Sequence, residues 1–210
     1  MRTIIGMFIF IAVFLFGNAV NAQPIVGVIF DAPSVFTSDE NKMQQLDNKL
    51  MGIFPAEKCN LLPSKMLTDK AQAYRSMHNM LADGEPDADK PLSSAILCEL
   101  GKQEGCAYIL LLEMKRLGQK NEIQPEYQKF NGRITTFGEK KSLVIMSLTD
   151  IQVLDTNSGQ YEYKHEFLSV GQTTTSKILG IGSNPKESKT MNDLFGNFIE
   201  KLEIKASAIP

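Results

Sequence analysis

The stretch from Ala107 to Val170 constrains the fold more than any other part of the chain, because it contains three apolar segments of strand length. The first is Ala107–Met114, with the sequence AYILLLEM, and the second begins near Leu143. The second and third are joined by Thr156-Asn157-Ser158-Gly159, whose Asn, Ser and Gly residues are typical of a tight turn with positive φ. The sequence therefore predicts two antiparallel strands joined at this turn, together with a third strand.

The segment after the turn alternates between aromatic and charged residues, which is the pattern of a strand with one covered and one solvated face. The covered face is predicted to carry Tyr161, Tyr163, His165 and Phe167. In that setting His165 is expected to be packed or hydrogen-bonded rather than to serve as a ligand or proton shuttle. The most apolar strand positions are predicted to be buried: Ile109, Leu111, Val144, Met146, Ile151 and Val153.

Two shorter apolar segments precede this region and predict two more strands. Pro24–Phe30 is predicted to be a strand buried on both faces, and Lys58–Leu62 a second strand that ends at Pro63. Between them, Thr37 and Glu40 have the spacing of a capping box, which predicts the start of a helix.

Apolar residues at helical spacing predict four helices in all. The third runs from about Pro91 to Glu104, with Gly105 just after it in the position that favours a left-handed residue. The last helix is predicted to be capped by Thr190 and Asp193. Three polar segments are predicted to be irregular, with a strand near Arg133–Phe137 as an alternative inside the second: Asp83–Lys90, Leu117–Lys141 and Gly171–Lys189.

These elements predict an α/β fold with a mixed sheet of about five strands. The early strands are expected to be parallel with helical crossovers, the later ones an antiparallel meander, and the C-terminal helix to pack on the sheet.

The first 22 residues have the pattern of a secretory signal peptide. Arg2 supplies a positive start, Ile4–Phe16 is almost wholly apolar, and Val20-Asn21-Ala22 fits a small-residue cleavage site. A permanent membrane anchor is the alternative, although the apolar run is shorter than the roughly 20 residues of a spanning helix. The sequence predicts residues 1–22 as a signal peptide, residues 23–210 as a single domain, a periplasmic or secreted location, and no stable membrane insertion after cleavage.

Charge and cysteine content limit the possible ligands. The formal net charge of −2 gives no basic footprint for nucleic acid. The three cysteines, Cys59, Cys98 and Cys106, leave two alternatives, namely one disulfide or three buried thiols. They lack the spacing of a zinc site, and the acidic loop Asp83–Lys90 lacks the ligand spacing of a calcium loop.

Several segments together resemble a bacterial envelope superfamily that includes CsgG, LpoB and the amino-terminal domain of TolB. They are the first strand PIVGVIFDAPS, the strand YILLLEM, and a long strand that ends in Asp155-Thr156-Asn157-Ser158-Gly159 before a return strand. The resemblance implies an α/β envelope domain that works by binding proteins. The chain departs from CsgG and LpoB, which are lipoproteins, in having no lipidation cysteine, and the resemblance transfers no functional residue.

The sequence identifies no catalytic residue, no cofactor site and no metal site. Asp31 ends the first strand, where some phosphohydrolases keep a nucleophile, but Pro33 occupies the position of their second Asp, so a turn or capping role is expected. Gly180-Ile181-Gly182 lacks the strand-to-helix context of a dinucleotide site.

Two function classes follow from these observations. The first is a non-enzymatic envelope protein that binds or helps to assemble another envelope protein. The alternative is a secreted hydrolase that acts on a small or envelope-derived substrate, which rests on the α/β class alone. The partner and the oligomeric state stay open.

The predicted topology also indicates where a partner would bind. The segments around residues 31–38, 117–141 and 171–189 should emerge at one rim, at the carboxyl ends of the parallel strands, where open α/β sheets usually bind ligands. The side chains expected to contact a partner at this rim are Tyr127, Phe130, Arg133, Phe137 and Lys177.

Overall fold

The computed structural model describes residues 23–81, 92–178 and 181–209, and its centre is one five-stranded mixed sheet. The strand order is β2-β1-β3-β4-β5, in which β1 is parallel to β2 and β3, and the other pairs are antiparallel. The strands are β1 (Ile25–Asp31), β2 (Asn60–Leu61), β3 (Tyr108–Phe130), β4 (Arg133–Asp155) and β5 (Tyr161–Ile178). The predicted α/β class with a mixed sheet is confirmed.

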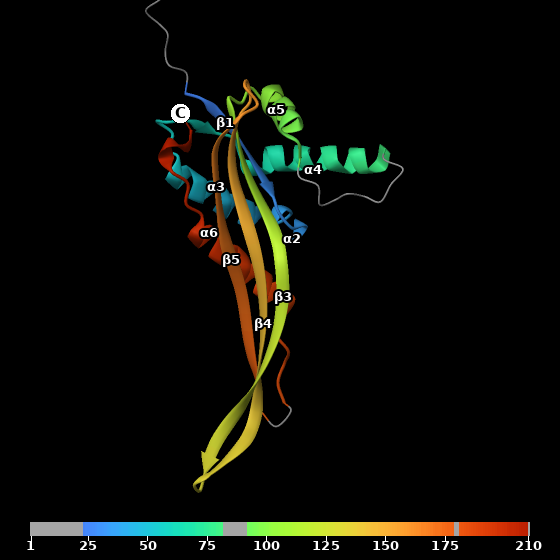
Figure 1. Ribbon diagram of the computed structural model, residues 1–210, viewed down its shortest axis with the longest axis vertical. Coiled ribbons are helices and arrows are strands. Elements are labelled where there is room, and N and C mark those ends of the chain that lie inside the picture. The colour runs from blue at the N-terminus through green and yellow to red at the C-terminus, as the bar shows by residue number, and fades with distance from the viewer. Residues whose placement is uncertain (1–22, 82–91, 179–180, 210) are drawn as a thin grey trace, which may run out of the picture.

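Helices cover both faces of the upper part of the sheet (Figure 1). The core cluster on one face contains residues of α3 and α6, and the cluster on the other face contains residues of α4 and α5. The helices are α2 (Ser34–Thr37), α3 (Glu40–Ile53), α4 (Ser64–Leu81), α5 (Ser94–Gln103), α6 (Glu187–Lys201) and a final 3-10 turn, η1 (Ala206–Ala208). The C-terminal helix therefore packs on the sheet as predicted.

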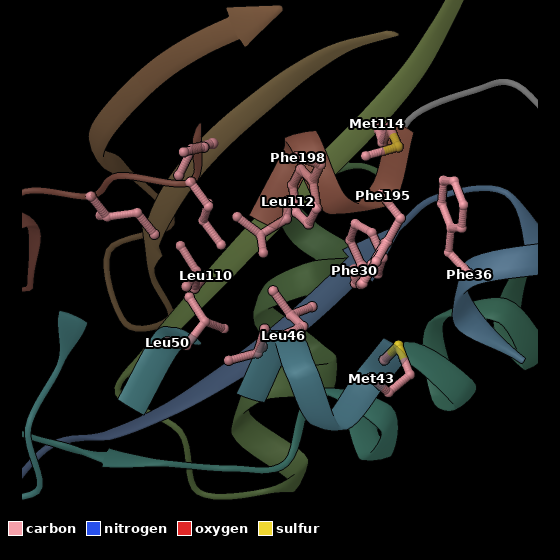
Figure 2. Packing of buried hydrophobic residues seen from close by; sticks show 14 of the residues in the cluster. Phe30, Phe36, Met43, Leu46, Leu50, Leu110, Leu112, Met114, Phe195 and Phe198 are labelled. Carbon is pink, nitrogen blue, oxygen red and sulfur yellow. The ribbon is translucent and has the colours of Figure 1, made fainter. Parts of the chain in front are cut away.

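The larger core is centred on the aromatic side chains of α6 (Figure 2). Phe198 is fully buried and stacks on Phe30 of β1, with ring centroids 5.2 Å apart, and on Phe167 of β5, at 5.9 Å. Phe195 lies against Phe36 of α2, at 5.3 Å between centroids. One helix thus joins the first strand of the sheet to the last.

Small residues beneath α6 let this helix approach β5 closely. A Cβ on Gly171 would lie 2.3 Å from the carbonyl oxygen of Thr190 in α6, so no larger residue fits there without moving the helix. Ser169 and Thr173 flank this glycine on the same face of β5 and are buried. The segment 171–189, predicted to be a loop, is β-strand up to Ile178 and helix from Glu187, so the prediction was wrong over these parts. The predicted cap at Thr190 and Asp193 was also wrong, because α6 begins at Glu187, directly after Lys186.

The projection at the lower end of Figure 1 is a long two-stranded ribbon, and it corrects the predicted excursion 117–141. β3 and β4 have 23 residues each and pair from Tyr108↔Asp155 to Phe130↔Arg133. Asn131 and Gly132 connect them with φ of 49° and 76°, the two positive angles of a tight hairpin turn. The segment is extended strand, paired along its whole length. Solvent lies on both of its faces, so no alternation of apolar and polar residues marks it as a strand in the sequence. The alternative strand near Arg133–Phe137 is part of β4.

Other local predictions met mixed outcomes. Asp155 accepts hydrogen bonds from the backbone of Asn157 and Ser158, and Gly159 has φ +70°, as the predicted turn requires. The helix α3 is capped by Asp39 and not by Thr37, which belongs to α2, because Asp39 accepts from the N–H groups of the first turn. The predicted loop Asp83–Lys90 lies outside the described residues.

The predicted face or burial was wrong for several strand residues, and a register shift explains one of them. A bulge between the pairs Val153↔Tyr163 and Leu154↔Tyr161 turns Tyr161 to the face opposite Tyr163. His165, predicted to be packed, is exposed. Of the predicted core positions, Val144 and Met146 are only half-buried, since the neighbouring residues of β4 face α6 instead, and the others are buried: Ile109, Leu111, Ile151 and Val153.

We expect Phe198→Ala to lower the free energy of unfolding by about 3–5 kcal/mol, because it removes a fully buried ring between two stacked partners. Urea-induced unfolding measures this loss. The matched control is Phe137→Ala on the ribbon, where the ring is 39% exposed and the change should stay within about 0.5 kcal/mol. Equal losses at the two positions would contradict the assignment of α6 to the core.

Candidate functional site

Large apolar side chains that face solvent gather on the ribbon and at the adjoining end of β5. Near the hairpin turn, Tyr127 is 66% exposed and Ile134 is 72% exposed. Further exposed members of this group are Leu117, Ile123, Phe137, Ile178 and Ile181. Exposed apolar side chains clustered on one projection are typical of a protein-interaction surface.

A shallow groove of about 430 Å³ lies within this group, where β3, β4 and β5 meet. Its walls combine apolar and charged side chains: Ile123, Pro125, Thr136, Phe137, Gly138, Glu139 and Lys177. The strands come close here, because a Cβ on Gly138 would lie 2.3 Å from the carbonyl oxygen of Lys177. The groove is therefore a feature of paired strands, with its side chains fixed in direction by the sheet.

Ion pairs within single strands and a hydrogen bond between β5 and β3 surround the groove. The Lys141 ammonium group lies 2.9 Å from the Glu139 carboxylate, and the Ser176 hydroxyl donates to Glu126 across 3.0 Å. Further along β3, Lys120 pairs with Glu122 at 2.8 Å, and the hydrogen bond between them raises the pKa of Lys120. These contacts are exposed, so their main effect is to hold both charge signs beside the apolar side chains.

The structure places all five predicted contact residues on this ribbon or at its junction with β5, and it describes the side chains of four of them. Tyr127 and Arg133 are exposed near the hairpin turn, and Phe137 and Lys177 line the groove. Phe130 is the last residue of β3, and its side chain is outside the described part of the structure. The predicted rim is thus a strand ribbon and not a set of converging loops.

Sequence reasoning missed the other residues of the groove and the exposed Ile134. The signal that would have found them is Asn131-Gly132, a dipeptide strongly favoured in two-residue hairpin turns. Once that turn is recognised, β-branched and polar residues on both sides of it become paired strands, and Ile123 and Ile134 fall on the projecting hairpin.

Asp31 has a structural partner. Its carboxylate accepts two hydrogen bonds from the Arg75 guanidinium of α4, at 2.7 and 2.5 Å. This two-point contact holds the end of β1 to α4 and occupies both carboxylate oxygens. Asp31 therefore tethers β1 to α4, in contrast to the predicted turn or capping role.

The three cysteines are buried free thiols, which decides between the two alternatives. Burial raises the pKa of the Cys106 thiol to about 11, with the Glu104 carboxylate acting in the same direction, and burial also raises the pKa of Cys59. At neutral pH both groups are protonated, so neither offers a thiolate for nucleophilic attack or metal binding. Within residues 23–81, 92–178 and 181–209, no group of three or more His, Cys, Asp or Glu side chains is placed to hold a metal ion.

No protein-family model and no curated protein matches the chain. Solved structures similar to it include lipoprotein GNA1162 from Neisseria meningitidis, at 11% identity and a TM-score of 0.33, with 85% of this chain and 96% of that chain covered. The hypothetical protein CT253 from Chlamydia trachomatis is 13% identical, with a TM-score of 0.31 and coverage of 86% and 95%. A Helicobacter pylori protein described as a homolog of a neuraminyllactose-binding hemagglutinin is 9% identical, with a TM-score of 0.42 and coverage of 89% of both chains.

At this level of similarity the solved structures assign neither a family nor a function to this chain. Among the helices that the structure describes, none is long and apolar enough to cross a membrane.

The buried Cys106 thiol predicts how stability depends on alkaline pH. Its folded pKa lies above the unfolded value, so its contribution is complete below about pH 9 and is lost as the pH rises towards about 11, where the unfolded chain binds fewer protons. Urea unfolding at a series of pH values should therefore show a steeper alkaline loss for the natural protein than for Cys106→Ala. Identical slopes would show that the thiol is not desolvated.

Proposed function

We propose that this protein is an exported, non-enzymatic component of the bacterial envelope that binds another envelope protein through the ribbon of β3 and β4. The observation that carries the proposal is the exposure of Tyr127, Ile134 and Ile123, three large apolar side chains on one projecting hairpin. Exposed hydrophobic surface of this kind costs solubility and is offset when a partner covers it.

The ribbon suits recognition by side chains better than by addition of a continuous strand. β1 pairs with β3 only as far as Glu113, so the outer edge of β3 beyond it has no strand partner among the described residues. Pro125 lies in the middle of this edge and removes one backbone donor, and Lys115, Lys120 and Lys129 add charge, features that discourage edge-to-edge pairing. Specificity would then come from the groove, with Phe137 supplying an apolar anchor and Lys177 a charge.

Substitution at the ribbon tests the binding role. We expect the combined variant Tyr127→Ala, Arg133→Ala and Phe137→Ala to lose capture of its partner from envelope extract, while the thermal unfolding midpoint stays near that of the natural protein because these side chains are exposed. A photoreactive residue in place of Tyr127 identifies the partner by cross-linking.

The control variant combines Asn157→Ala and Ser158→Ala in the turn at the opposite end of the sheet. Loss of capture in this control, with capture retained in the ribbon variant, would refute the assignment of the ribbon as the binding surface.

Export is tested separately, by amino-terminal sequencing of the mature protein. The apolar run Ile4–Phe16 followed by Ala22 leads us to expect a mature chain that begins at Gln23. A product that still begins at Met1 and sediments with membranes would instead support the permanent anchor.

A further inference from the structure

The face of the sheet opposite α6 carries a second apolar surface, distinct from the ribbon groove. On that face α4 and α5 pack with β1, the first part of β3 and the end of β4 at Leu154. Beyond this region the face is uncovered among the described residues, as Figure 1 shows for the lower part of the sheet. We call it the open face, and its half-buried or exposed apolar residues on β4 and β5 are Val144, Met146, Leu148, Leu168 and Val170.

Charged residues lie at both ends of the open face, and the strand register fixes their positions. Residues that are partners in the strand register form rows across the face. Asp150 lies in one row with Glu113 and Glu166, and Lys115 lies beside Leu148 in the next row on the same face. At the other end, Glu122 lies in the row of Ser142, and Lys140 lies one row further. Acidic and basic residues are therefore arranged in opposite order at the two ends.

This order is self-complementary under one particular two-fold rotation. An axis that runs across the strands midway between Val144 and Met146 exchanges Lys140 with Asp150 on β4. The same axis exchanges the row of Lys115 with the row of Glu122 on β3. Two kinds of unlike-charge pair thus arise from a single choice of axis, with Val144 and Met146 between them on β4 and Lys120 beside Val144 on β3.

The alternative axis, parallel to the strands, gives the opposite result. Each row would then face its own copy, so Asp150 would face Asp150 and Lys140 would face Lys140. Like charges brought together in this way disfavour the association. The charge pattern selects the crossed arrangement, in which the strands of the two copies run antiparallel.

The spacing of packed sheets allows these pairs to form. Sheets that pack face to face lie about 10 Å apart, a gap that apolar side chains from both sheets fill and that a lysine and a carboxylate can span together. Lys140 is exposed and forms no ion pair with any residue in the described ranges, so it is available to a second molecule. Asp150 already pairs with Lys115 at 2.9 Å and has a second carboxylate oxygen to offer.

We propose that the open face is the dimer interface of this protein, in which a second copy packs antiparallel across Val144 and Met146 and Lys140 of each copy pairs with Asp150 of the other. The ribbon groove stays accessible in such a dimer because Glu139 and Lys177, which line it, lie on the same face of the strands as Ile145 and Gly171, the face opposite the interface. Two groove surfaces would then be presented in opposite directions, and this arrangement does not require the partner-binding role to be correct.

Sedimentation velocity over a wide concentration range tests the proposal on the exported protein. We expect a monomer–dimer equilibrium that Met146→Glu abolishes, because it places a charge in the apolar centre, and that Lys140→Glu weakens by roughly tenfold or more by creating a like-charge pair. The matched control is Lys129→Glu, the same reversal on the ribbon near the hairpin turn, which should leave the equilibrium unchanged.

A double variant guards against effects on folding. Lys140→Glu combined with Asp150→Lys exchanges the two charges, so dimerisation should recover relative to Lys140→Glu alone, while the thermal unfolding midpoint of each variant reports its own fold. A natural protein that is monomeric at every concentration would overturn the proposal. So would a dimer that Met146→Glu and Lys140→Glu leave intact, or an open face that becomes protected only when a different protein is added.

Discussion

The stacking of Phe198 between Phe30 and Phe167 is the interaction on which the rest of the structure depends. Phe30 belongs to β1 and Phe167 to β5, and these strands are separated in the sheet by β3 and β4. No hydrogen-bond ladder joins β1 directly to β5, so α6 is the element that holds the two sides of the sheet against one core. Burial of several aromatic rings on one helix provides the hydrophobic free energy for this contact.

Close packing of α6 also explains why the two faces of β4 and β5 differ. The helix approaches β5 so closely at Gly171 that no side chain fits there, and small buried residues lie nearby at Ser147, Ser169 and Thr173. Large apolar residues lie on both faces of these strands: Ile145, Ile151 and Phe167 pack in the core with α6, whereas among the described residues no helix covers Met146 or Leu148 on the opposite face. Among the described residues, α6 therefore covers one face of β4 and β5, and the part of the other face around Met146, beyond α4 and α5, has no helix over it.

The parts of the fold that sequence reasoning predicted are those with a strong local or apolar signal. The parallel pairing of β1 and β3 followed from two apolar segments with helices between them, and the turn at Gly159 followed from its residue types. The ribbon was missed because neither of its faces is buried, so alternation carries no contrast between apolar and polar residues. The face of Met146 could not be read from the sequence, since Ser147 and Thr149, which look like surface residues, are the ones buried under α6.

The ribbon separates folding from binding within one pair of strands. Near Ile109 and Val153, β3 and β4 are fully buried and a substitution acts on stability. Beyond the pair Gly138↔Ile178, the hairpin has only two strands, and Ile134 is 72% exposed. Two strands alone are marginally stable in water, so this end depends on the three-stranded sheet behind it for its order. A polar residue in place of Ile134 would leave that sheet unchanged, and any effect of such a change on partner capture would therefore report on recognition and not on folding.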